Sequence, residues 1–311
     1  MSSSPPPASG ESTEQDEVPT CFRHPQREAY VRCARCNRVI CPDCMREAAV
    51  GFHCVECVAE GNRTVRQART AFGGKPVRAP YVTWTVLTLI GLGFLAQLST
   101  TTEPLAASHS VLVTQFGMLG AFADVGVASG EFYRLFTSEL LHGGVFHLLV
   151  NGFALYILGP QLERWLGHSR FLALWLLSAL GGSLLTYVLE PTQLTVGAST
   201  ALFGLFGAIF VLGRRLGFDT RFVLILLVVN LVITFTIPNI SWTGHIGGLL
   251  SGCVLALAYG YLPRNRAQPQ PSGHRDRARL LTHAAVTIGY ATLLLAVTAA
   301  QTWFLTGTLM S

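Results

Sequence analysis

Four polar side chains stand in apolar stretches of this sequence, at spacings that suit nucleophilic catalysis. His147 and Asn151 are four residues apart, so on a helix they share one face. Ser199 and His245 each stand near the start of a later apolar run. A serine hydroxyl becomes a strong nucleophile when a neighbouring base takes its proton, and histidine is a common base. The sequence therefore predicts Ser199 as a nucleophile and His245 as its base.

Acyl transfer also needs donors for the charge that develops on the attacked carbonyl oxygen. His147, Asn151 and the backbone N–H of Ser199 are the donors that this sequence offers. No carboxylate is suitably placed to orient the imidazole of His245, so we expect a dyad rather than a triad. Taken singly, these residues have simpler interpretations as a helix cap or as polar groups satisfied inside a bundle. The hypothesis depends on their convergence.

The composition indicates the environment in which these residues must meet. The 311-residue chain is 50% hydrophobic and 13% charged, with a mean hydropathy of +0.44, which is typical of a membrane protein. Although the net charge is +5, the basic residues cluster beside apolar runs, which argues against nucleic-acid binding. Most of the apolar runs are long enough to cross a bilayer as a helix. They cover residues 81–98, 144–162, 170–189, 198–213, 221–237, 242–262 and 281–305.

We therefore expect seven transmembrane helices, with a merged or broken fourth and fifth pair as the alternative, because those two runs are short. Basic residues concentrate in alternate connections, which by the positive-inside rule places the N-terminus in the cytoplasm and the C-terminus outside. In this orientation the four polar residues lie in the outer halves of three helices that run the same way. Small residues every three or four positions predict close helix contacts. These are Gly197, Ala201, Gly204, Gly207, Gly244, Gly248 and Gly252.

From about residue 78 to 305 the chain resembles the rhomboid intramembrane serine proteases. The resemblance is carried by five motifs, namely His147-x-x-x-Asn151, Gly197-Ala198-Ser199, His245-x-x-Gly248-x-x-x-Gly252, Gly159-x-x-x-Glu163-x-x-x-Gly167 and Tyr133-Arg134. It implies an all-α polytopic membrane protein with a six-helix core, a seventh C-terminal transmembrane helix and a water-filled cavity open to the outside. Residues that match Ser199 and His245 form the family's dyad, and those that match His147 and Asn151 form its oxyanion site. Glu163 and Arg134 would be structural.

Three positions depart from the family pattern. Thr200 stands where a glycine usually follows the serine, Phe203 where a tyrosine often packs on the histidine, and Tyr133 where a tryptophan is usual. Our leading hypothesis is a serine endopeptidase that cleaves transmembrane substrates near the outer face of the cell membrane. A catalytically silent rhomboid-like protein that binds transmembrane clients is the first alternative, and Thr200 leaves it open. A transporter or proton channel is the second.

Seven of the eight cysteines lie in a short N-terminal segment, in pairs with the spacing of metal sites. Two structural zinc ions would use all the paired ligands and supply the folding energy of so small a module. The segment resembles a B-box-like zinc finger, and the resemblance implies a cross-braced scheme. Its ligand sets are Cys21, His24, Cys41 and Cys44 on one ion, and Cys33, Cys36, Cys54 and Cys57 on the other. Sequential pairing, and ligation by His53 in place of Cys54, stay open.

The expected order of segments is a disordered leader (residues 1–20), a double zinc module (21–57), a basic linker (58–79) and a membrane protease domain (80–306). We expect no cofactor for catalysis. The expected partners are transmembrane protein substrates, the lipid bilayer and a cytoplasmic protein that binds the zinc module, with no nucleic acid.

Overall fold

The computed structural model describes residues 18–64, 68–101, 103–238, 240–263 and 272–309. The chain divides into two compact units, residues 1–67 and residues 68–311, which we call the Cys-rich unit and the helical unit. The boundary between them falls within the segment 58–79. The leader predicted for residues 1–20 lies outside the described residues as far as residue 17.

Three small antiparallel hairpins and one helix make up the Cys-rich unit. The strand pairs are β1 (Thr20–Cys21) with β2 (His24–Glu28), β3 (Val31–Arg32) with β4 (Val39–Ile40), and β5 (Met45–Glu47) with β6 (Phe52–Cys54). A 3-10 turn, η1 (Pro42–Cys44), and helix α1 (Val55–Thr64) complete it. Apart from Ala29 and Ile40, its buried core consists of cysteines. So small an apolar core cannot hold a fold by hydrophobic burial alone.

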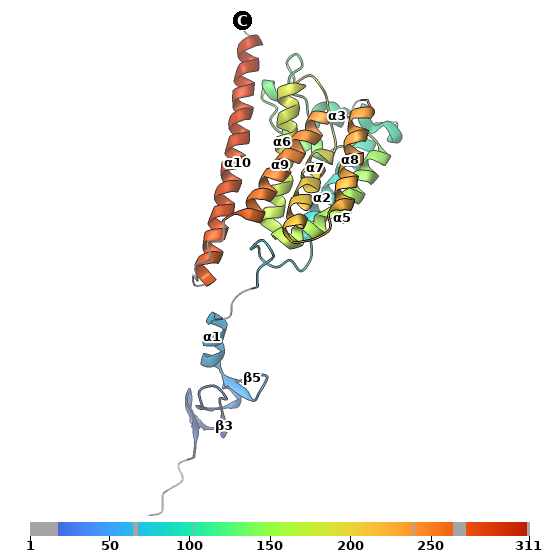
Figure 1. The fold of residues 1–311 in the computed structure, drawn as a ribbon. Coiled ribbons are helices and arrows are strands. Elements are labelled where there is room, and N and C mark those ends of the chain that lie inside the picture. Colours follow the sequence, from blue (N-terminus) through green and yellow to red (C-terminus); the bar gives the residue numbers. More distant parts are fainter. Residues whose placement is uncertain (1–17, 65–67, 102, 239, 264–271, 310–311) are drawn as a thin grey trace, which may run out of the picture. The chain divides into compact units, whose positions relative to one another are not determined.

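Each apolar run predicted from the sequence coincides with a helix of the helical unit (Figure 1). These helices are α2 (Tyr81–Leu98), α5 (Val145–Leu166), α6 (His168–Leu189), α7 (Ser199–Arg215), α8 (Arg221–Thr236), α9 (Trp242–Tyr261) and α10 (Ser272–Leu309). By length and composition, α2, α5, α6, α9 and residues Arg277–Gly307 of α10 can cross a membrane. At 17 and 16 residues, α7 and α8 are shorter but separate helices. The predicted helical fold with a small Cys-rich domain is confirmed, and seven crossings stay a prediction.

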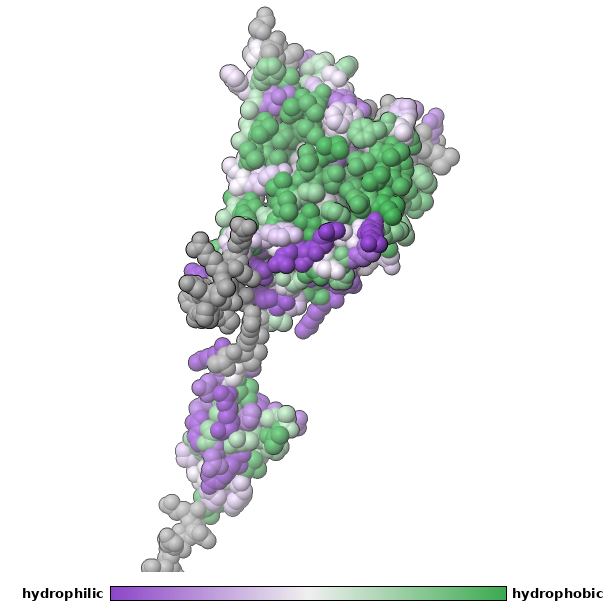
Figure 2. Space-filling view, viewed as in Figure 1, coloured by the Kyte–Doolittle hydropathy of each residue, from purple (hydrophilic) through white to green (hydrophobic). Residues whose placement is uncertain are grey.

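The surface of the helical unit is largely apolar. Figure 2 shows a broad hydrophobic face on this unit, bordered at its lower edge by hydrophilic residues. Large apolar side chains such as Phe153, Leu250 and Leu293 are more than half exposed. A continuous apolar surface of this kind is favourable in lipid and unfavourable in water. The chain is a multi-pass membrane protein.

Helices α7 and α9 pack backbone against backbone at glycine positions. A Cβ on Gly252 would lie 2.1 Å from the carbonyl oxygen of Gly204, and one on Gly248 would lie 2.0 Å from that of Thr200. Only glycine permits so close an approach. The small-residue spacing therefore predicts this contact correctly, and the contact sets how near a residue at the start of α7 lies to one at the start of α9.

Short elements fill the chain between α2 and α5. They are η2 (Pro104–His109), α3 (Val111–Phe116), η3 (Val127–Ser129), α4 (Arg134–Thr137) and η4 (Ser138–Leu140). Arg134 is almost fully buried and donates to Glu131 Oε2 at 2.7 Å and to the carbonyl oxygens of Thr114 and Gly117 at 2.9 Å. The hydrogen bond from Arg134 holds the pKa of the Glu131 carboxyl below its usual range. Arg134 thus ties this segment together.

Glu163 has a comparable structural place at the other end of the bundle. Its carboxylate accepts from the backbone N–H groups of Val82 and Thr83 at 3.0 and 2.9 Å, and from the Thr83 hydroxyl at 2.6 Å. Helix α2 begins after Pro80, which has no side chain that can cap it, so Glu163 satisfies the N–H groups left open there. Both residues for which the family resemblance implies structural roles make structural contacts.

Candidate active site and metal centres

Ser199 and His245 face each other across the contact between α7 and α9. The distance between Ser199 Oγ and His245 Nε2 is 2.8 Å, which is a good hydrogen bond. Ser199 opens α7, and His245 stands in the first turn of α9, so both side chains lie at the same end of the bundle. His245 is only 7% exposed. The structure therefore brings together the two residues that the sequence pairs as nucleophile and base.

Two further contacts fix the imidazole of His245. Phe203, one turn after Ser199, stacks on the ring with centroids 4.0 Å apart and planes at 15°. Thr234 of α8 contacts the other nitrogen of the ring, with its Oγ1 2.7 Å from His245 Nδ1. The sequence indicated no partner for this nitrogen, because a threonine inside an apolar helix usually bonds only to its own backbone.

Gly197 makes room for His147 beside the serine. Its φ of +128° lies in the region that favours glycine. A Cβ on Gly197 would lie 2.9 Å from His147 Nε2 and 3.6 Å from Ser199 Oγ, so both atoms border the same point. His147 Nδ1 accepts from the N–H of Gly143 at 3.2 Å, which leaves the ring proton on Nε2. The Nε2–H of His147 is thus a donor close to the nucleophile.

Asn151 follows His147 by one helical turn on α5 and is 5% exposed. Its Nδ2 is buried and has no hydrogen-bond partner. Buried amide groups are nearly always paired, so a buried donor without a protein partner is able to donate to another group. Among the described residues, the structure leaves this donor available next to the candidate site.

A buried carboxylate that the sequence did not single out supports the start of α7. Glu139 is 4% exposed, and its Oε2 accepts from the backbone N–H of Ala201 at 3.3 Å. The residue before the helix, Ala198, makes no side-chain cap, so Glu139 supplies the cap from a distant segment. The neighbouring carbonyl of Ser138 accepts from the N–H of Gly197 at 3.0 Å. These contacts hold both flanks of Ser199.

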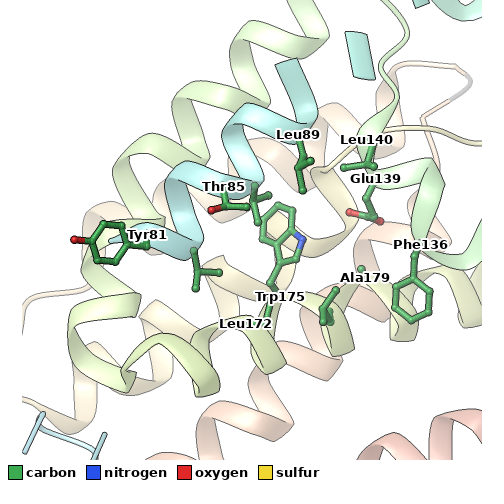
Figure 3. A pocket seen from close by; sticks show the side chains of 12 residues that line it. Tyr81, Thr85, Leu89, Phe136, Glu139, Leu140, Leu172, Trp175 and Ala179 are labelled. Carbon is green, nitrogen blue, oxygen red and sulfur yellow. The ribbon is translucent and has the colours of Figure 1, made fainter. Parts of the chain in front are cut away.

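Glu139 also borders a cavity of 370 Å³ between α2, η4 and α6. Figure 3 shows its carboxyl group beside Leu140, with Trp175 in the middle of a largely apolar lining. The lining of this cavity includes neither Ser199 nor His245. This cavity is therefore separate from the candidate site.

Thr200, the departure from the family pattern next to the serine, fits against glycines of two other helices. A Cβ on Gly182 of α6 would lie 2.1 Å from the Thr200 methyl group, and one on Gly244 would lie 3.1 Å from its hydroxyl oxygen. The space that a side chain at these positions would take is filled by Thr200. Its extra bulk is therefore accommodated at glycine positions of α6 and α9.

The seven cysteines of the Cys-rich unit and His24 gather in two groups. One holds Cys21, His24, Cys41 and Cys44, and the other holds Cys33, Cys36, Cys54 and Cys57, with all ligand atoms of a group within 4.8 Å of one another. This is the cross-braced grouping rather than the sequential one, and His53 belongs to neither group.

The distances within these groups fit a tetrahedral ion. A zinc ion with Zn–S bonds of about 2.3 Å holds its sulfur ligands about 3.8 Å apart, and nitrogen slightly closer. The Sγ atoms of Cys36 and Cys54 are 3.8 Å apart, and His24 Nδ1 lies 3.3 and 3.5 Å from the Sγ atoms of Cys41 and Cys44. Both groups could bind a metal ion.

Comparison with known proteins points to one family. The Rhomboid domain model matches residues 129–262, a range that contains all four candidate residues. YdcA of Bacillus subtilis (strain 168), which its name assigns to the rhomboid proteases, is 39% identical over 155 residues, covering 48% of this chain and 77% of that protein.

Two further relatives match over a smaller share of their length. Rhomboid protease GluP of the same bacterium is 35% identical over 174 residues, covering 53% of this chain and 31% of that protein. RHOMBOID-like protein 1 of Arabidopsis thaliana is 34% identical over 185 residues, covering 54% of this chain and 47% of that protein. The chain spans less than half the length of these two relatives.

Proposed function

The chain belongs to the rhomboid family, and on this basis we propose that it is a serine endopeptidase that cleaves transmembrane segments of other proteins within the bilayer. The 2.8 Å contact between Ser199 Oγ and His245 Nε2 carries the proposal. A serine hydroxyl paired with an imidazole in a buried site is the arrangement that acyl transfer requires.

In the proposed mechanism, Ser199 Oγ attacks the scissile carbonyl carbon while His245 Nε2 takes the hydroxyl proton. The C–O bond forms as the carbonyl oxygen becomes an oxyanion, and in this proposal Asn151 Nδ2, His147 Nε2 and the Ser199 N–H would donate to it; the unpaired Asn151 Nδ2 and the Nε2 proton of His147 support this role. The imidazolium then gives its proton to the leaving amine nitrogen, and the C–N bond breaks. A water molecule, deprotonated by His245, hydrolyses the acyl ester and restores Ser199.

We also propose that the active site lies near the outer face of the cell membrane, with the N-terminus cytoplasmic and the C-terminus outside. Ser199 and His245 stand at the N-terminal ends of α7 and α9, whereas Arg214 and Arg215 stand at the C-terminal end of α7. The positive-inside rule places an arginine-rich end in the cytoplasm and so the serine end outside.

For the Cys-rich unit we propose two structural zinc ions and a role in binding a cytoplasmic protein. Each ligand group would fill all four positions of a tetrahedral ion, which leaves no open site for catalysis. The ions would hold the fold, and no step of the proteolytic reaction passes through them. The segment boundaries expected at residues 20, 57 and 79 remain part of this proposal.

The experiment that tests the proposal is cleavage of a model transmembrane substrate in liposomes by the wild type, Ser199→Ala and His245→Ala. We expect each variant to lose at least about 10³-fold in turnover, because serine and histidine act as a unit. Ser183→Ala is the matched control, since among the described residues that serine donates to the Leu135 carbonyl and not to either member of the dyad. If both variants cut as fast as the wild type, the dyad is wrong.

Fluorophosphonate labelling and a flux assay test the two alternative functions. A wild type that never labels at Ser199 would support the catalytically silent reading, in which the chain binds transmembrane clients without cutting them. A transporter or channel would instead produce a flux across reconstituted vesicles that survives Ser199→Ala. Retention of the hydrogen-bonded pair of Ser199 and His245 favours the protease.

A further inference from the structure

We infer that Thr234 is a positioning residue that fixes the tautomer of His245, so that the catalytic unit has three members rather than two. The inference rests on the proposed function, because it assigns a role within the same site. Thr234 Oγ1 lies 2.7 Å from His245 Nδ1 and 2.7 Å from the carbonyl oxygen of Asn230, one turn back on α8.

The direction of these two hydrogen bonds follows from their chemistry. A threonine hydroxyl has one proton, and the Asn230 carbonyl oxygen can only accept, so Thr234 donates to Asn230. Its lone pair then accepts from His245, which requires the proton of the neutral ring to be on Nδ1. His245 Nε2 is left with a free lone pair facing Ser199 Oγ at 2.8 Å. This is the tautomer in which an imidazole can take the serine proton.

Stacking on Phe203 alone would not achieve this. The stacked ring, with its planes at 15°, restricts the tilt of the imidazole, but the stacking is the same whichever of the two ring nitrogens carries the proton. The hydrogen bond to Thr234 distinguishes the two tautomers, because it needs the proton on Nδ1. A carboxylate has this role in a serine protease triad, and here a neutral hydroxyl occupies the same position on the base.

Thr234 also makes the base depend on the docking of α8. Leu227 and Thr234 are the two buried side chains of this 16-residue helix, and the rest of its side chains are partly or fully exposed. One of the two buried side chains of α8 is therefore the one that contacts His245. A displacement of α8 would leave His245 Nδ1 without its acceptor.

The test compares Thr234→Val, which removes the hydroxyl at nearly the same volume, with Thr234→Ser, which keeps it. Thr236→Val is the matched control, since Thr236 of the same helix donates to the Val232 carbonyl at 2.8 Å, is exposed and does not contact His245. We expect Thr234→Val to lower kcat about 10- to 100-fold, because the hydrogen bond strengthens when the imidazole becomes charged in the transition state. KM should change little, and Thr234→Ser should recover most of the loss.

The ring nitrogens give a readout that is independent of turnover. In full-length protein with ¹⁵N-labelled histidine, His245 should show a protonated Nδ1 and an unprotonated Nε2, assigned by the signals that His245→Ala removes. Thr234→Val should shift this population toward the other tautomer, and Thr236→Val should not. Wild-type kcat in Thr234→Val, or equal loss in Thr234→Ser, would overturn the inference while the protease proposal stood. A wild type that neither cuts nor labels would remove both.

Discussion

In the Cys-rich unit six of the eight core side chains are cysteines, and the other two are Ala29 and Ile40. The helical unit buries a large set of leucine, phenylalanine and alanine side chains and brings α7 and α9 together at glycines. One interior is built around two groups of side chains that could bind metal ions, and the other around steric fit between helices. The two units should therefore respond to different perturbations.

This difference bears on how each site is held. The ligand groups of the Cys-rich unit have no fixed geometry without the strands that carry them, and those strands are only two to five residues long. Ser199 and His245 are instead placed by helices of 17 and 20 residues that cannot move apart without opening the core. With the metal ions proposed above, the Cys-rich unit would depend on them for its fold, whereas the proposed mechanism at Ser199 and His245 uses no ion.

The largest expected effect is the loss of metal from the Cys-rich unit. Treatment of the full-length protein with a strong chelator should unfold residues 21–57, because binding of a structural zinc ion contributes on the order of 10–16 kcal/mol in small modules. The helical unit should keep its thermal transition. Limited proteolysis with mass spectrometry would locate the new cleavage sites, and elemental analysis should give two zinc ions per chain before treatment.

Two cysteine variants sharpen this prediction. Cys44→Ser removes a ligand of one group and should lower the metal content by about one ion, because a three-ligand site binds zinc more weakly. Cys253→Ser is the control, since Cys253 lies in α9 and in neither group. Chelation that leaves residues 21–57 as resistant to protease as before would contradict the metal-dependent fold.

The next effect concerns the helix contact. Gly252→Ala places a methyl group 2.1 Å from the Gly204 carbonyl oxygen, so α7 and α9 must separate. We expect a loss of about 3 kcal/mol or more in stability, because backbone cannot move aside as a flexible side chain can. Thermal unfolding in detergent would measure it, and the metal content of the Cys-rich unit should stay unchanged.

Gly289→Ala serves as the control for this substitution. Gly289 also lies in a long apolar helix, α10, but a Cβ there would meet no atom within 4 Å. Because alanine favours a helix over glycine, this variant should be neutral or slightly stabilising. Equal transitions for the two alanine variants would mean that the glycine contact does not set the distance between α7 and α9.

Much of this architecture could be predicted from the sequence because it rests on local patterns. Long apolar runs predict helices, glycine spacing predicts the contact of α7 with α9, and the spacing of the cysteine pairs predicts two ligand groups. The pairing of Ser199 with His245 followed from the common depth that the predicted topology gives them. Each of these patterns can be recognised within one segment, or between two segments whose direction across the membrane is predicted.

Thr234 and Glu139 could not be found in the same way. Thr234 follows Asn230 in an apolar helix, where a hydroxyl that bonds to the preceding turn explains its presence completely. Glu139 belongs to the irregular chain between α2 and α5, and its bond to the Ala201 N–H joins residues 62 positions apart. Both residues act through contacts between distant segments, and the spacing of residue types along the sequence does not indicate such contacts. The sequence analysis left His245 Nδ1 without a partner for this reason.

The smallest expected effect comes from removing an ion pair, and the two units differ in how buried their ion pairs are. In the Cys-rich unit, Arg27 and Asp43 pair with side chains 57% and 64% exposed, and such pairs add little to stability. In the helical unit, Arg134 is 2% exposed and bonds to Glu131, which is 30% exposed. Removal of one partner of the more buried pair should therefore have the larger effect on unfolding.

Glu131→Gln should lower the thermal unfolding temperature of the helical unit at neutral pH by about 2–4 °C, which corresponds to about 1 kcal/mol. Because Arg134 lowers the pKa of the folded Glu131 carboxyl, its contribution is complete above the unfolded pKa and is lost as pH falls through the folded pKa. The wild type and Glu131→Gln should thus converge in acid. Glu103→Gln is the control, since Glu103 forms an exposed contact with His109 in the same unit. A difference that persists unchanged at pH values well below the folded pKa would show that packing, and not the charge of Glu131, anchors Arg134.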